Sequence, residues 1–154
     1  SYFRKTFILK SKPKNADVIM TADNSYVLMV NQRNGFAGNN WQEPKFRNLS
    51  DRFKVGENLI TVLATNGDEN DNPAGLWLGL RLQFENESTL DIVSDKTWKV
   101  TTNNIKNWSQ RKFDDSKWKN ALELGGVNLS PWNLAVASSS SSRNSLLLVH
   151  RTSR

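Results

Sequence analysis

The stretch from Leu76 to Phe84 constrains the fold more than any other part of the chain. Its sequence, LWLGLRLQF, places an apolar residue at every second position. Side chains alternate between the two faces of a β-strand, so the leucines and Phe84 share one face, while Trp77 and Arg81 lie on the other. The pattern predicts a long, half-buried strand against which the rest of the core packs. Its opposite face is available to water, a ligand or a neighbouring domain.

The other apolar segments are short and are separated by turn signals. Strand patterns occur at Tyr2 to Lys10, Leu59 to Thr65, on both sides of Asp23-Asn24-Ser25 within Val18 to Asn31, and on both sides of Ser94-Asp95-Lys96 within Thr89 to Thr101. Because Asp, Asn and Ser favour turns, the two interrupted segments predict β-hairpins. Asn31 to Asn40 is rich in Gly and Asn and predicts a loop, and Asn48 to Phe53 predicts one helical turn. Short strands joined by turns indicate an all-β sandwich.

Composition excludes several kinds of function. The chain has 154 residues and a net charge of +6, with its basic residues spread out and no nucleic-acid-binding motif, so we expect no nucleic-acid partner. No apolar run approaches the ~20 residues that span a bilayer, so we expect no membrane insertion. The absence of cysteine excludes thiolate chemistry, and the single histidine, His150, offers no credible centre for a Ser-His-Asp triad.

The last residues differ in composition from the rest. Ser138 to Ser142 is a run of serines, which is typical of a flexible linker. We therefore expect one β-sandwich domain at residues 1–133 and a Ser-rich tail at residues 134–154. The apolar Leu146 to Val149 within that tail is either the start of a further element or not native to the domain.

Several segments, taken in order, resemble a known family. They are YFRKTFIL at Tyr2 to Leu9, LSDRFKVGENLITVLATN at Leu49 to Asn66, AGLWLGL at Ala74 to Leu80, SDKTWKV at Ser94 to Val100 and FDDSKWKNA at Phe113 to Ala121. This order resembles the galactose-binding-like jelly-roll domains at the N-terminal side of bacterial α-L-rhamnosidases, and the sugar-binding domain of the β-galactosidase and β-glucuronidase family. The resemblance implies a jelly-roll β-sandwich without catalytic residues, in a larger secreted or periplasmic bacterial protein.

A carbohydrate site needs aromatic faces for the C–H surfaces of sugars, and polar groups for their hydroxyls. Trp41 follows two asparagines and a Gly-rich loop, and Trp77 faces away from the aliphatic row of its strand. The expected carbohydrate-binding residues are Asn31, Arg33, Asn39, Asn40, Trp41 and Trp77. The alternative for both tryptophans is packing, with Trp41 under the loop and Trp77 buried on both sides or at a domain contact.

Two acidic segments suggest further chemistry. Asp68, Asn70 and Asn72 alternate with Glu69 and Asp71, a density of oxygen ligands that suits calcium, although a solvated loop has the same composition. The adjacent carboxylates Asp114 and Asp115 precede a serine and are expected to cap a turn rather than to act as an acid/base pair. We expect no catalytic residues, and no cofactor other than calcium at that loop.

These observations lead to one hypothesis with two rivals. The chain is expected to be a non-catalytic carbohydrate-binding module of a larger extracytoplasmic protein, with a glycan or neighbouring domains of the same chain as its partners. The first rival is a structural or protein-interaction sandwich without a sugar site. The second is an accessory domain that braces the active site of a glycoside hydrolase.

Overall fold

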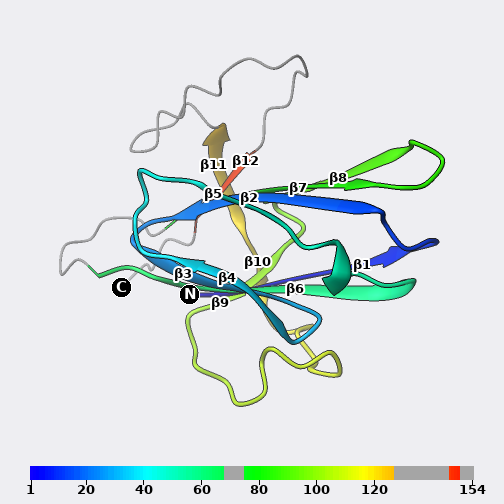
Figure 1. The fold of residues 1–154 in the computed structure, drawn as a ribbon. Helices are drawn as coiled ribbons and strands as arrows, with labels where there is room; N and C mark the ends of the chain where they lie inside the picture. The colour runs from blue at the N-terminus through cyan, green and yellow to red at the C-terminus, as the bar shows by residue number, and fades with distance from the viewer. Residues whose placement is uncertain (68–74, 127–145, 150–154) are drawn as a thin grey trace.

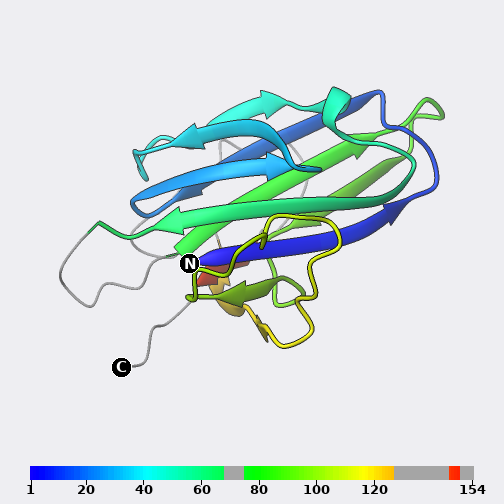
Figure 2. The same cartoon turned by 90° about the horizontal axis from the view of Figure 1, so that it is seen from below.

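The structure is a computed structural model that describes residues 1–67, 75–126 and 146–149. In this part of the chain, two antiparallel sheets stack face to face (Figures 1 and 2). Sheet 1 has the order β10 (Lys119–Asn120), β9 (Lys99–Thr101), β1 (Tyr2–Leu9), β6 (Gly56–Thr65), β3 (Ser25–Val30) and β4 (Arg33–Gly38). Sheet 2 has the order β11 (Leu122–Gly126), β12 (Leu146–Val149), β7 (Gly75–Gln83), β2 (Asn15–Ala22) and β5 (Lys45–Asn48), with β8 (Thr89–Val93) also on β7. The expected all-β, jelly-roll β-sandwich is confirmed.

Strand β7 has the central position that its alternating sequence predicts. It pairs with β2 along almost its whole length, and with β8 and β12 on its other side. Its inner leucines, Leu76, Leu78, Leu80 and Leu82, are at most 2% exposed and form the middle of the core. Opposite them lie the inner residues of sheet 1, such as Leu28 and Val62. The apolar alternation therefore predicted both the strand and its buried face.

The two expected hairpins are wrong, because each pair of strands is divided between the two sheets. Strands β2 and β8 lie in sheet 2, whereas β3 and β9, which follow them, lie in sheet 1. At the first crossing, Asp23 N–H donates to the Gly75 carbonyl (3.0 Å) and Asn24 N–H to the Thr65 carbonyl (2.9 Å), so the turn bridges the sheets. Consecutive apolar strands can bury their inner rows by facing each other across a core, and their turn residues are the same in either case.

The expected loop from Asn31 to Asn40 is also wrong, since most of it forms strand β4. Strands β3 and β4 make a hairpin around Asn31 and Gln32, whose φ angles are 51° and 66°. Two central residues with positive φ are the mark of a tight hairpin turn, which asparagine tolerates better than most residues. The expected helical turn is confirmed as the 3-10 helix η1 (Ser50–Arg52).

Residues 102–118, between β9 and β10, lie on the outer face of sheet 1. Figure 2 shows this segment crossing over β1. Arg4 on β1 is 1% exposed beneath it, and its guanidinium donates to the Asp115 carboxylate (2.8 Å) and to the carbonyls of Gln110 (3.1 Å) and Trp108. It also lies 5.3 Å from the ring centroid of Phe113. The segment is thus fastened over one side of the sheet, which leaves the outer side of β3 and β4 open.

Strand β12 comes from the expected tail and adds to sheet 2. Its Leu148 and Val149 are paired with Leu76 and Gly75 of β7, and it also pairs with β11. The boundary at residue 133 stays a prediction. Among the residues described, no helix has the length and apolar character needed to cross a membrane.

Candidate functional site

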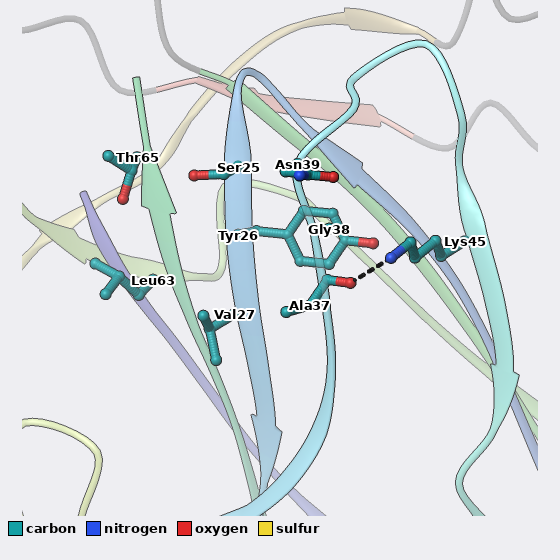
Figure 3. A pocket seen from close by; sticks show the side chains of 9 residues that line it. All are labelled: Ser25, Tyr26, Val27, Ala37, Gly38, Asn39, Lys45, Leu63 and Thr65. Atoms are coloured by element: carbon teal, nitrogen blue, oxygen red, sulfur yellow. Dashed lines mark hydrogen bonds between the residues drawn. The ribbon is translucent and has the colours of Figure 1, made fainter. Parts of the chain in front are cut away.

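An apolar row crosses the open part of sheet 1 on its outer face. Leu63 on β6 is in register with Val27 on β3, and Val27 is in register with Ala37 on β4. Val27 is 42% exposed, although it lies in the middle of the sheet. These side chains form the floor of an open trough of about 430 Å³ (Figure 3). A volume of this size suits a small ligand.

Polar groups surround this floor. Ser25 and Thr65 form the next cross-strand pair, and Asn39 follows the end of β4. At the edge, Lys45 of β5 reaches over from sheet 2 and donates to the Ala37 carbonyl at 2.8 Å (Figure 3). The complete lining is Ser25, Tyr26, Val27, Ala37, Gly38, Asn39, Lys45, Leu63 and Thr65. The trough therefore combines a flat apolar floor with hydroxyl, amide and ammonium groups.

Tyr26 and Gly38 form the wall beside Lys45. The Tyr26 ring is 3% exposed and its hydroxyl donates to the Met20 carbonyl at 3.3 Å. Burial raises the pKa of Tyr26 to about 12, and the positive charge of Arg47 opposes this shift. Gly38 lies so close to the ring that a Cβ there would be 2.5 Å from Cε1. The ring can pack against β4 only because residue 38 has no side chain.

Of the residues expected to bind carbohydrate, Asn39 alone lines the trough. Asn40 accepts a hydrogen bond from the Gln42 amide (3.0 Å) and so shapes the turn before β5. Trp41 is half-buried, and its carbonyl accepts from the Thr21 hydroxyl (2.8 Å). Arg33 lies at the other end of β4, where it donates to the Asp51 carbonyl at 3.0 Å. The structure thus separates these residues instead of gathering them in one site.

Asn31 is occupied by contacts within the protein. Its side-chain amide donates to the Arg52 carbonyl and to Asn58 Oδ1, both at 2.8 Å, and its Oδ1 accepts from the Leu59 amide at 2.9 Å. Asn58 is fully buried and in turn holds the backbone at Lys54. With both ends of its amide engaged, Asn31 fastens the β3–β4 turn to the start of β6.

Trp77 is buried, as the packing alternative proposed. It is 5% exposed, on the row of β7 that points away from the core, and it is paired with the fully buried Thr21. Within the described part of the chain its indole N–H has no hydrogen-bond partner. So little exposure leaves no open ring face on which a sugar could stack.

The expected calcium ligands, Asp68, Asn70 and Asn72, lie outside the described residues. Within residues 1–67, 75–126 and 146–149, no group of three His, Cys, Asp or Glu side chains could hold a metal ion. Asp114 accepts a hydrogen bond from the Ser116 amide (2.9 Å), so it does cap a turn. Hydrogen bonding to Ser116 holds the pKa of Asp114 below its usual value. A general acid needs the opposite shift.

Sequence reasoning missed the trough because its floor combines the β3–β4 hairpin with β6, which lies far from it in the chain. One signal was present, namely the small residues Gly35, Ala37 and Gly38 beside a strand with alternating apolar residues. Small side chains next to larger ones on one sheet face leave a hollow, but the sequence does not say which strand lies next to which.

Comparisons with protein-family models and with curated proteins find no match. Among solved structures, an α-L-rhamnosidase from Streptomyces avermitilis, complexed with L-rhamnose, matches 77% of this chain with 27% identity and a TM-score of 0.70. A lectin from Pleurotus ostreatus matches 85% of the chain, with 24% identity and a TM-score of 0.77 in the apo form, and 22% and 0.73 in complex with GalNAc.

The chain spans only part of these proteins, namely 12% of the rhamnosidase and 38% of the apo lectin. The matched parts share the two-sheet architecture described above. The resemblance expected from the sequence segments is confirmed, and the chain has the galactose-binding-like β-sandwich fold.

Proposed function

We propose that this chain is a non-catalytic carbohydrate-binding module of a larger, extracytoplasmic bacterial protein, and that the trough on sheet 1 is its binding site. One observation carries the proposal. The open outer face of β6, β3 and β4 presents an exposed apolar row between polar groups, in a hollow of about 430 Å³. Val27, at the centre of the row, is 42% exposed, so its apolar surface is accessible to a ligand.

The chemistry of the trough fits that of a sugar. One face of a pyranose ring consists of C–H groups, which would lie on Leu63, Val27 and Ala37. Its equatorial hydroxyls would point to the sides, toward Ser25, Thr65, Asn39 and Lys45. Tyr2 is in register with Leu63, and its ring centroid is 5.0 Å from that of Trp108, so aromatic side chains extend the apolar row beyond the trough.

The comparisons support a role beside a carbohydrate-active protein. The Streptomyces rhamnosidase structure is a complex with L-rhamnose, and one lectin structure is a complex with GalNAc. These sugars are ligands of the rhamnosidase and of the lectin. Since this chain covers so little of the rhamnosidase, a module attached to a separate catalytic domain accounts best for the match. The hydrogen bond from the Ser116 amide to Asp114 and the ion pair of Asp115 with Arg4 give these two carboxylates structural roles.

The proposal is tested by a glycan array, followed by calorimetry on the glycans that bind. We compare the wild type with Val27→Asn, which puts an amide into the floor without adding charge. The substitution removes part of the apolar contact with the sugar. We expect the binding free energy to weaken by about 1 kcal/mol, which lowers the affinity about fivefold. The screen is run with and without calcium, because the expected calcium loop adjoins the end of β6.

Phe46→Asn is the matched control. Phe46 is 56% exposed and also lies on a strand, but in sheet 2, where it is in register with Ile19. Its replacement should leave glycan affinity unchanged. If the folded protein binds no glycan, or if Phe46→Asn weakens binding while Val27→Asn does not, the proposed site is wrong.

A domain-bracing role is the second candidate, and one observation favours it. Phe46, Ile19, Gly79 and Val93 form an in-register apolar row on the outer face of sheet 2. Gly79 leaves the row flat, which suits contact with a neighbouring domain more than it suits a small ligand. A folded protein without glycan affinity would favour this role.

A further inference from the structure

We propose that the glycan bound in the trough is acidic, with a carboxylate or sulfate held at the edge by Lys45. This inference rests on the proposed function and makes it more specific. The first observation is the charge of the lining. Of the nine described residues around the trough, Lys45 is the one charged side chain, and no carboxylate is among them.

The ammonium of Lys45 is held in place with donors to spare. One of its hydrogen bonds goes to the Ala37 carbonyl at 2.8 Å, which draws the side chain from sheet 2 across to the edge of sheet 1. An ammonium group has three N–H donors, so two remain for a ligand. Because Ala37 is part of the floor, a sugar lying on that floor would have its edge next to this charge.

A second cation lies nearby on the same strand. Arg47 follows Lys45 by two residues, so both side chains are on the same side of β5. Its charge acts on Tyr26, which is itself part of the lining. From Asn39 to Arg47 the chain carries these two cations and one carboxylate, Glu43, which gives a local net charge of +1.

The ion pairs at strand β4 lie away from Lys45. Asp51 contacts both Arg33 and Arg52, at the opposite end of β4 from Lys45. The whole chain has a net charge of +6, and such a field draws anionic ligands toward the surface. A neutral sugar would use the floor and could accept a hydrogen bond from Lys45, but a carboxylate or sulfate would add the attraction of opposite charges.

The test uses pairs of glycans that differ only in charge. Tri-galacturonate is compared with its methyl ester, and a sulfated chondroitin tetrasaccharide with its desulfated form, so that carboxylate and sulfate recognition are measured separately. We expect at least one charged member to bind about tenfold more tightly than its uncharged partner, as is typical of a charge-assisted hydrogen bond. Affinity for that glycan should fall as sodium chloride is raised.

The variant Lys45→Met keeps the length of the side chain and should remove the preference, whereas Lys45→Arg should restore most of it. Lys10→Met, at the end of β1 farthest from Tyr2, removes a lysine away from the trough and should have no effect. Thermal melts check that the loss of the Ala37 contact has not unfolded the protein.

Equal affinity for both members of each pair, together with binding to neutral glycans on the array, would overturn the inference and leave the proposed function intact. A preference for charged glycans that survives Lys45→Met would overturn it as well. Failure of the folded protein to bind any glycan would overturn the inference and the proposed function together.

Discussion

At the scale of single residues, Gly38 packs directly against the buried side chain of Tyr26. A Cβ on residue 38 would lie 2.5, 2.7 and 2.8 Å from Cε1, Cζ and the hydroxyl oxygen of the buried Tyr26. We expect Gly38→Ala to lower the free energy of unfolding by about 1 to 3 kcal/mol, because the ring must shift within a packed core. Chemical denaturation measures this change.

Gly79→Ala is the matched control for that prediction. Gly79 is also in a strand, but a Cβ there would meet Ile19 Cγ2 at 3.5 Å, which is an ordinary contact. The free energy of unfolding of the Gly79→Ala variant should stay within about 0.5 kcal/mol of that of the wild type. Equal destabilisation by the two substitutions would mean that the ring contact has no special importance.

Tyr26 should also make stability depend on pH in the alkaline range. Its pKa is about 12 in the folded protein, above the usual 10.0, because burial disfavours the phenolate. Below pH 10 both states hold the proton. Between pH 10 and 12 the unfolded state releases it first, so the free energy of unfolding should fall by as much as about 2 to 3 kcal/mol.

Tyr26→Phe removes this titration and isolates its contribution. From pH 8 to 12, the free energy of unfolding of the wild type should fall relative to that of Tyr26→Phe, since only the wild type has a phenol that titrates in this position. Parallel curves over the whole range would contradict the assignment.

Residue types alone do not tell which side chains are free to bind a ligand, and the reason is physical. Asn31 and Trp77 have side chains suited to sugars, but hydrogen bonds to Leu59 and Arg52 occupy the first and burial encloses the second. Whether a polar or aromatic group is free to bind depends on its neighbours in space. A single sequence describes only its neighbours along the chain.

At the scale of elements, Arg4 joins strand β1 to the segment of residues 102–118. Arg4→Met would remove its bonds to Asp115, Gln110 and Trp108 and leave their acceptors to water. We expect the free energy of unfolding to fall by about 2 to 4 kcal/mol, because one partner of a buried ion pair is removed. The side chain of Asp115 is 26% exposed, so water can partly solvate its carboxylate in the variant. Hydrogen exchange should accelerate within residues 103–118 more than in β7.

Arg81→Met provides the comparison for Arg4. Arg81 pairs with Asp91 through two bonds of 2.8 and 3.0 Å, but its side chain is 43% exposed. Exposed ion pairs contribute little to stability, so we expect the free energy of unfolding to fall by less than about 1 kcal/mol. A larger loss for Arg81→Met than for Arg4→Met would refute the view that Arg4 holds the segment in place.

The elements also show how far sequence patterns reach. The alternation in β7 predicted a strand, its inner face and its burial, because these follow from local geometry and hydrophobicity. It did not predict that β2 and β3, or β8 and β9, cross between sheets. Turn residues such as Asp23 and Asn24 allow either a hairpin or a crossing, and long-range packing decides between them.

At the scale of the whole molecule, the sandwich leaves one sheet partly covered and partly open. Residues 102–118 lie over β1 (Figure 2), and the trough is lined by residues of β6, β3 and β4. The ordered segments shared with a known family predicted the fold, which the solved structures confirm. These segments did not indicate the trough. It depends on which strands lie next to each other and on the side chain of Lys45, which extends from sheet 2 to the Ala37 carbonyl in sheet 1.

The proposed sugar site lies on the outer face of sheet 1. The most direct test is nuclear magnetic resonance mapping of backbone amide shifts, during titration with a glycan selected on the array. We predict that the largest shifts occur at Val27, Ala37, Leu63 and their neighbours in the trough. Shifts concentrated instead around Phe46, Ile19 and Val93 on sheet 2, or the absence of any localised shift, would contradict the claim.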